Sequence, residues 1–343
     1  MTSRERVLKA LDLEEPDRVP WMEEWFDYRV AEKILAQIGG PTIDWELRRN
    51  NPEISVPPEI AGATALDNLA FELVPPFFSV TKSGEDMDVI VDGLIKSEDD
   101  LNMLNQLPDP DDEQIYRRAE QFVKRYRADF AMIATIRTGI SNTYLSMGII
   151  DFCSALLDNV ELVQAIYERF SNWCARTARN VSEMDFDLVQ VNDDLAFKTG
   201  PFFSPDVFRG LFLPHMKRVV KNIKLPWIYH TDGDITLLLD DLLSLGMKGI
   251  ANIEPPCMDI ADLKRRYGHR LCLIGNIDIG RTLSRGSPQE TDREVKQRIG
   301  EIGPGGGYIL ASSNSITSYC QPDNVMALSD AVEKYGHYPI KMT

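Results

Sequence analysis

The stretch PWIYHTDGD, residues 226–234, joins a short apolar run to a polar turn that carries His230 and Asp232. From residue 130 onward, other runs have the same character: each is short, mostly apolar and followed by Gly, Asp, Asn or Pro. They are FAMIATI (130–136), FDLVQV (186–191), GIANIE (249–254), LCLIGNI (271–277) and GYILAS (307–312). Short apolar runs without alternation are typical of strands buried on both faces of a parallel sheet.

Amphipathic stretches separate these runs, as in SPDVFRGLFLPHMKRVVKNI, where Ser204 is a candidate helix N-cap. Tandem βα units predict a barrel or a doubly wound sheet. Two earlier runs, RVPWME (18–23) and ALDNLAFEL (65–73), bring the expected strands to eight, the number that closes a barrel. We therefore expect an α/β fold, a (β/α)8 TIM barrel with an N-terminal helical extension, as one domain over residues 1–343.

The composition narrows the range of partners. A formal charge of −16 disfavours nucleic acid and acidic lipid surfaces, which bind through clustered Lys and Arg. No apolar run approaches the roughly 20 residues of a membrane helix, and the N-terminus has no apolar signal core. The five cysteines are scattered without a CxxC pair, which favours reduced thiols. We expect a cytoplasmic protein that binds neither nucleic acid nor membranes.

A barrel collects its functional residues at the carboxyl ends of its strands. The polar residues at the expected strand ends are Glu23, Glu24, Arg137, Asn192, Asp193, Asp194, His230, Asp232, Glu254, Asn276, Asp278, Ser312, Ser313 and Asn314. Each also has an ordinary structural interpretation. Asp232 before Gly233 is a common turn pair, Asp193 and Asp194 are potential caps, and His230 is a potential core-edge histidine. The prediction of a site therefore rests on the set.

Several of these segments resemble the uroporphyrinogen decarboxylase superfamily of barrels. The resemblance is carried by HTDGD, GNID and GGGYILASSNSI, by SRERVLKALDLEEPDRVP near the start, and by NDDLAFKTGPFFSPDVFRGLFLPHMKR in the middle. It extends over essentially the whole chain. The superfamily holds two chemistries, the decarboxylation of uroporphyrinogen and corrinoid-dependent methyl transfer.

The first strand end argues against the decarboxylase branch. That branch has the basic segment Arg-Gln-Ala-Gly-Arg there, which clamps a tetrapyrrole bearing eight carboxylates. This chain has WMEEWFD (21–27) instead. Glu23, Glu24 and Asp27 would repel such a substrate. The decarboxylase also has a histidine in its last strand-end loop, where this chain has Asn314.

Thiol-alkylating methyltransferases of the superfamily bind zinc through a His-x-Cys pair and a later cysteine. The corresponding pair here is His230 and Asp232, and the last loop has Ser312, Ser313 and Asn314. Because thiolates are absent from these positions, thiol alkylation is disfavoured, while a site with nitrogen and oxygen ligands remains open.

The resemblance is then to O-demethylating methyltransferases, which pass a methyl group from a methoxylated aromatic to the Co(I) of a separate corrinoid protein. It implies a corrinoid carried by a partner, a small-molecule methyl donor, possible zinc and a homodimer. We expect His230, Asp232, Asp193 and Glu254 to be catalytic. His230, Asp232 and Glu254 are also the candidate metal ligands. The expected substrate-binding residues are Glu23, Trp25, Tyr144, Asp194, Phe197, Asn276 and Asn314.

An aryl methyl ether needs a proton or a Lewis acid on its oxygen, because its leaving group is a phenolate of pKa about 10. His230 fits either role, as an acid oriented by a nearby aspartate or as a metal ligand. An apolar pocket is expected from Trp25, Phe26, Phe77, Phe78, Tyr144, Phe197, Phe202 and Phe203, although aromatic residues at such spacings are often core. The alternatives are a uroporphyrinogen decarboxylase and a non-catalytic barrel that binds a corrinoid or tetrapyrrole.

Overall fold

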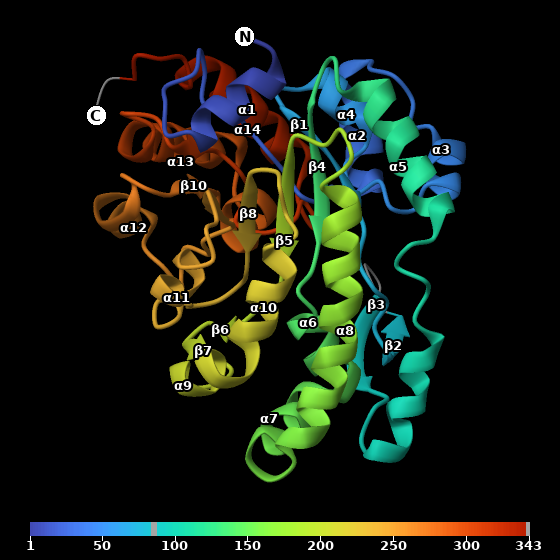
Figure 1. Cartoon of the computed structure of the whole chain (residues 1–343). Helices are drawn as coiled ribbons and strands as arrows, with labels where there is room; N and C mark the ends of the chain where they lie inside the picture. The colour runs from blue at the N-terminus through green and yellow to red at the C-terminus, as the bar shows by residue number, and fades with distance from the viewer. Residues whose placement is uncertain (84–87, 341–343) are drawn as a thin grey trace.

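The computed structural model describes residues 1–83 and 88–340 of the chain. A seven-stranded parallel sheet forms the centre, in the order β1-β4-β5-β8-β9-β10-β11 (Figure 1). Its strands are β1 (Asn68–Glu72), β4 (Ala131–Ile136), β5 (Leu188–Asn192), β8 (Trp227–His230), β9 (Gly249–Ala251), β10 (Cys272–Ile274) and β11 (Tyr308–Ile309). All six residues of β4 and all four of β8 are buried, as expected of strands covered on both faces. The α/β fold with a parallel sheet is confirmed.

The expected strand over residues 18–23 is reduced to single bridges. Trp21 bridges Leu66, next to β1, and also Leu310, next to β11, both in parallel. The peptide N–H of Met22 donates to the carbonyl of Leu310 at 2.9 Å, and that of Asp67 donates to the carbonyl of Trp21 at 2.8 Å. This segment therefore joins the two edges of the sheet. Pro20 has no N–H to donate, which explains why a longer ladder does not form.

Helices surround the sheet (Figure 1). They are α1 (Ser3–Leu11), α2 (Tyr28–Ile38), α3 (Trp45–Asn50), α4 (Pro58–Ala63), α5 (Glu113–Tyr126), α6 (Ile140–Met147), α7 (Ile149–Asp158), α8 (Val160–Val181), α9 (Pro205–Val207), α10 (Leu213–Val220), α11 (Leu239–Leu243), α12 (Ile260–Tyr267), α13 (Pro288–Ile302) and α14 (Pro322–Tyr335). A 3-10 helix spans Glu98–Gln106, and π-helical turns span Phe208–Phe212 and Ile279–Leu283. The side chain of Ser204 caps α9, as predicted.

Two small hairpins complete the described structure. β2 (Ser79–Ser83) pairs with β3 (Asp88–Gly93), and β6 (Ala196–Phe197) pairs with β7 (Gly200–Pro201). Figure 1 shows β6, β7 and α7 at the end of the molecule opposite to α1. Within the described residues, no single helix has the length and apolarity to cross a membrane; α6 and α7 together meet that test, but they are bent by 100° at their junction.

Helix α1 covers the amino-terminal ends of the strands. Arg4 donates to Asp187, one residue before β5, at 2.5 Å, and Arg6 donates to Asp67, one residue before β1, at 2.6 Å. The opposite, carboxyl-terminal ends of the strands are therefore the end at which the predicted site residues gather. The single domain expected over 1–343 extends to residues 341–343, which lie outside the described residues.

Candidate active site

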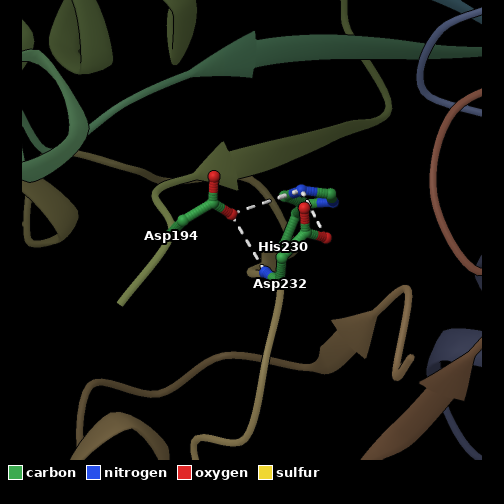
Figure 2. A group of neighbouring side chains, drawn as sticks. All are labelled: Asp194, His230 and Asp232. Carbon is green, nitrogen blue, oxygen red and sulfur yellow. Dashed lines mark hydrogen bonds and ion pairs between the residues drawn. The ribbon is translucent and has the colours of Figure 1, made fainter. Parts of the chain in front are cut away.

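The carboxyl ends of β5 and β8 bring Asp194, His230 and Asp232 together (Figure 2). His230 is the last residue of β8, and it pairs in register with Asn192, the last residue of β5. The imidazole Nε2 lies 3.8 Å from Oδ1 of Asp194 and 3.9 Å from Oδ1 of Asp232. These distances are too long for direct hydrogen bonds, so a third group has room to engage Nε2.

The loop after β8 holds Asp232 in place. Its backbone N–H donates to Oδ1 of Asp194 at 2.9 Å, and the amide of Asn314 reaches both of its carboxylate oxygens, at 3.0 and 2.9 Å. Gly233 follows with a φ of +79°, and a Cβ there would lie 2.5 Å from the carbonyl oxygen of Phe197. The predicted Asp-Gly turn is thus present, and the same turn presents the Asp232 carboxylate to His230.

Glu24 is the main partner of His230; the sequence placed it at the first strand end but did not connect it with His230. Its Oε2 lies 2.9 Å from the imidazole Nδ1, in a contact whose angle is poor for a hydrogen bond. Asn192 donates to the same oxygen at 3.1 Å, and Gln190 also donates to it. The only sequence signal was its place beside Glu23 at the first strand end. The structure therefore adds a carboxylate from the segment that joins the two sheet edges to the predicted pair.

These contacts set the protonation of the site. Burial lowers the pKa of His230, but the carboxylates of Glu24, Asp232 and Asp194 outweigh it and raise the pKa to about 10. Burial raises the pKa of Asp232 to about 7, against the attraction of His230 and with repulsion from Asp194. Burial opposes ionisation of Glu24, yet the charge of His230 leaves the pKa of Glu24 lowered. At neutral pH the site holds an imidazolium between carboxylates.

Two of the predicted catalytic carboxylates are engaged elsewhere. Glu254 accepts the N–H of Gly233 at 3.0 Å and lies 3.5 Å from the thiol of Cys257, so it supports the loop rather than facing His230. Asp193 accepts the N–H and hydroxyl of Thr138, both at 2.6 Å, and the N–H of Ser141 at 2.8 Å. Both hold backbone at the edge of the site, and their predicted catalytic roles stay predictions.

Glu23 and Asn276 are buried beside the site. Glu23 accepts the hydroxyl of Ser312 at 2.6 Å and the indole N–H of Trp21 at 2.8 Å, which links the first and last strand ends. Burial raises the pKa of Glu23 to about 8 against these hydrogen bonds. Asn276 donates to the carbonyl of Ile253 at 2.8 Å, and its buried Oδ1 has no partner among the described residues.

The predicted aromatic residues divide into three groups. Phe26, Phe78 and Phe203 are buried in the core, whereas Trp25 and Phe77 are only partly buried. A row of rings leads outward from the site: Tyr144 lies 5.2 Å from Phe202, and Phe202 lies 4.5 Å from Phe197, between ring centroids. Burial and the nearby Asp194 carboxylate raise the pKa of Tyr144, which keeps its hydroxyl neutral. Phe197 at the outer end is 52% exposed.

The donor set suits a divalent metal of the zinc type. One ligand atom each from Asp194, His230 and Asp232 lie within 4.8 Å of one another. Three protein ligands with an open fourth position are typical of catalytic zinc, and imidazole and carboxylate are both zinc ligands. The set differs from the sequence prediction in that Asp194 replaces Glu254, because Glu254 is held by the Gly233 N–H. A metal would have to displace the proton of His230.

Comparison with known proteins establishes the family. The family model for uroporphyrinogen decarboxylase (URO-D) matches residues 2–335, so the chain belongs to the uroporphyrinogen decarboxylase family. The family expected from the sequence is confirmed. Across the fold, a solved methyltransferase from Methanosarcina mazei superposes with a TM-score of 0.73 over 98% of this chain and 99% of that one, at 18% identity. This likeness supports the fold.

Two groups of curated relatives match parts of the chain. The methylcobamide:CoM methyltransferase MtaA of Methanosarcina barkeri is 26% identical over 158 residues, which are 46% of this chain and 44% of that protein. A uroporphyrinogen decarboxylase of Shewanella loihica is 31% identical over 143 residues, 39% of each chain. The matched segments thus span less than half of these relatives.

Proposed function

We propose that this chain is a corrinoid-dependent methyltransferase that moves a methyl group from a methoxylated aromatic compound to the Co(I) of a separate corrinoid protein. The observation that carries the proposal is the cluster of Asp194, His230 and Asp232 at the carboxyl ends of β5 and β8. The likeness to MtaA supports methyl transfer. The acidic first strand end, with Glu23 and Glu24 where the decarboxylases have arginines, argues against a substrate with eight carboxylates.

In this proposal His230 supplies the proton that the leaving oxygen needs. As Co(I) attacks the methyl carbon, the carbon–oxygen bond breaks and Nε2–H of His230 protonates the departing phenolate. The pKa of His230, raised to about 10 against burial by Glu24, is close to that of a phenol, so the transfer is nearly balanced in energy. Glu24 lies against Nδ1 as an ion-pair partner, and together with Asp194 and Asp232 it stabilises the imidazolium before the transfer.

Zinc fits the same residues and would give His230 a different role. Asp194, His230 and Asp232 would hold it, and zinc would supply Lewis acidity to the ether oxygen. Asn314 would then orient the Asp232 ligand through its amide, as second-sphere hydrogen bonds commonly do. Measuring the zinc content of His230→Ala and of the unsubstituted protein separates the role of proton donor from that of metal ligand. The variant loses bound zinc only if His230 is a ligand.

The corrinoid protein has a candidate docking surface beside the site, which we call the α7 patch: Ile149, Ile150, Cys153, Ser154, Leu157 and Phe197. These residues surround an apolar hollow of about 380 Å³. Leu157 is 91% exposed and Ile150 is 78% exposed, and such clustered apolar exposure marks interaction sites. Phe197 connects the patch to the site, since its carbonyl packs on Gly233 next to Asp232. A partner docked there would bring its corrinoid close to the cluster of Asp194, His230 and Asp232.

The remaining expectations belong to the same proposal. The Trp21 segment would act as the eighth member of a closed (β/α)8 barrel and α1 as the N-terminal extension, within a single domain. A reducing cytoplasm suits Co(I), and the five cysteines are free. The homodimer stays a prediction.

The test is single-turnover methylation of a Co(I) corrinoid protein with a panel of methoxylated aromatics, followed by the absorbance of Co(I). We expect donor-dependent loss of the Co(I) spectrum with at least one donor. Tight binding of the corrinoid protein without methylation by any donor would favour the non-catalytic barrel. Release of carbon dioxide from uroporphyrinogen would favour the decarboxylase and contradict the proposal.

A further inference from the structure

Arg137 follows directly after β4 and has an unsatisfied guanidinium. Its buried Nε has no hydrogen-bond partner, and no carboxylate of the described residues lies within ion-pair distance of it. Arg6 and Arg18, by contrast, both pair with Asp67, at 2.6 and 3.2 Å. Asp193 and Glu72 lie near enough for their charges to act on Arg137, but a partly buried cation without a direct ion pair is costly unless a ligand or water completes it.

The sheet register places Arg137 in the same layer as His230. Ile136 pairs with Val191, so the next position, Arg137, aligns with Asn192, which in turn pairs with His230. Residues aligned in a parallel sheet face the same side, and Asn192 contacts the Glu24 partner of His230 on that side. Two strand spacings separate the backbones of Arg137 and His230, roughly 10 Å. This is the scale of a substituted benzene ring with its substituents.

The surroundings of Arg137 leave its donors for a ligand. Its guanidinium lies over the ring of Phe77, 4.9 Å from the centroid, a contact that needs none of its N–H donors. Asp193 is near, but both of its oxygens are taken by Thr138 and Ser141. Burial raises the pKa of Glu72, at the end of neighbouring β1, and so favours its neutral form despite Arg137.

A second unsatisfied donor lies one layer deeper on the same face. Thr135 precedes Arg137 by two residues in β4 and is 2% exposed, and its hydroxyl has no partner among the described residues. Thr135 aligns with Gln190, whose side chain also reaches Glu24 in the interior. Two unpartnered donors, one in β4 and one directly after it, are thus aligned with Gln190 and Asn192, whose side chains contact Glu24.

We infer that Arg137, aided by Thr135, binds the carboxylate of an anionic methyl donor and sets its methoxyl group toward His230. The donor class is a methoxybenzoate, a ring with a carboxylate at one end and the reacting ether at the other. The inference rests on the proposed function for its choice of donor. Arg137 is in this account a specificity-determining residue that distinguishes charged from neutral aryl ethers.

Calorimetric binding without any corrinoid protein tests this inference apart from the methyl transfer. The ligands are ortho-, meta- and para-methoxybenzoate and the matched methoxyphenols, which are neutral at pH 7. We expect Arg137→Gln to weaken the binding of the tightest methoxybenzoate by roughly 10- to 100-fold, the effect of losing hydrogen bonds to a charged group, and to leave the binding of the methoxyphenols unchanged. Arg137→Lys should retain part of the benzoate affinity.

Controls separate recognition from folding. Arg270→Gln changes an exposed arginine just before β10, at the far end of the sheet, and should leave both ligands unaffected. Arg137→Gln should unfold at the same or a higher temperature, because an unpaired charge is removed. Equal loss of benzoate and methoxyphenol, unchanged benzoate binding, or no binding of benzoate to the unsubstituted protein would each overturn the inference. Benzoate binding without methyl transfer would instead count against the proposed function alone.

Discussion

The two ends of the sheet carry carboxylates in opposite electrostatic settings. At the amino-terminal end, Asp67 meets Arg6 and Arg18, and Asp187 meets Arg4. At the carboxyl-terminal end, Glu24, Asp194 and Asp232 converge on His230, and Arg137 has no carboxylate within ion-pair distance among the described residues. Charges that are paired within the fold contribute to its stability, whereas charges without a matching partner can bind a ligand, a proton or a metal. We therefore expect substitutions at one end to change stability and those at the other to change chemistry.

The largest expected effect is on catalysis at His230. His230→Ala removes the proposed acid or metal ligand, so the single-turnover rate of methyl transfer should fall by about 10² to 10⁴. The matched control is His337→Ala, since His337 is exposed on the surface after α14. A His230→Ala rate within a few-fold of the unsubstituted protein would show that the chemistry lies elsewhere.

The opposite end should respond in stability. Asp67 is 1% exposed and accepts from Arg6, from Arg18 and from the N–H of Trp21 at 3.0 Å. Asp67→Asn removes the buried charge that Arg6 and Arg18 share and leaves them with their more exposed partners, Asp17 and Glu333, so we expect a loss of about 2 kcal/mol in the free energy of unfolding. Denaturant titration measures it. A change below about 0.5 kcal/mol would mean that water replaces the carboxylate readily.

The pH dependence of unfolding should sharpen the contrast between the two ends of the sheet. It is measured on protein from which a chelator has removed any metal. Burial lowers the pKa of His230, but Glu24 and its neighbours raise it from 6.5 to about 10, so the folded state holds this proton more tightly. The stabilisation is complete below pH 6.5 and is lost as the pH rises toward 10, with a slope of at most about 1.4 kcal/mol per pH unit.

The variant His230→Gln has no imidazole to titrate and therefore lacks this pH-dependent stabilisation. Between pH 7 and pH 9 its free energy of unfolding should fall less than that of the unsubstituted protein. Parallel pH profiles for the two proteins would show that His230 is neutral in the folded chain.

The smallest expected effect concerns the α7 patch. Leu157→Asp places a charge among apolar side chains of the patch, and we expect affinity for the corrinoid protein to fall by roughly 10-fold, with donor binding unchanged. The control is Ile38→Asp, at the end of α2, where an exposed apolar residue lies outside the patch. Equal affinities for all three proteins would remove the patch from the interface.

Much of the fold was predictable because its central strands are buried on both faces. The apolar runs from residue 130 onward mark β4, β5, β8, β9, β10 and β11, although every strand is shorter than its run, the last three by three residues or more. The run at 18–23 is buried throughout, as expected of a strand, but it pairs with the sheet only through single bridges at Trp21, because Pro20 has no N–H to donate.

The site was predictable in part. His230 and Asp232 follow one strand, and Asp194 follows its neighbour, so local sequence placed them together. Glu24 was missed as the His230 partner because the two residues lie on segments that do not pair with each other, and strand order does not show how far a side chain reaches. Glu254 looked equivalent to the aspartates, but the Gly233 N–H holds its carboxylate. Hydrogen bonding, rather than residue type, decided which carboxylates face His230.

The most direct test of the account is the single-turnover rate of methyl transfer to Co(I) for Asp232→Asn and Asp67→Asn, measured side by side on folded protein with the same donor. Asn removes the charge from Asp232 beside His230, and it removes the charge from Asp67 at the far end of the sheet. We predict a loss of about 100-fold or more for Asp232→Asn and a rate within a few-fold of the unsubstituted protein for Asp67→Asn. Equal rates for the two variants, or a larger loss for Asp67→Asn, would contradict the assignment of the chemistry to the carboxyl-terminal cluster.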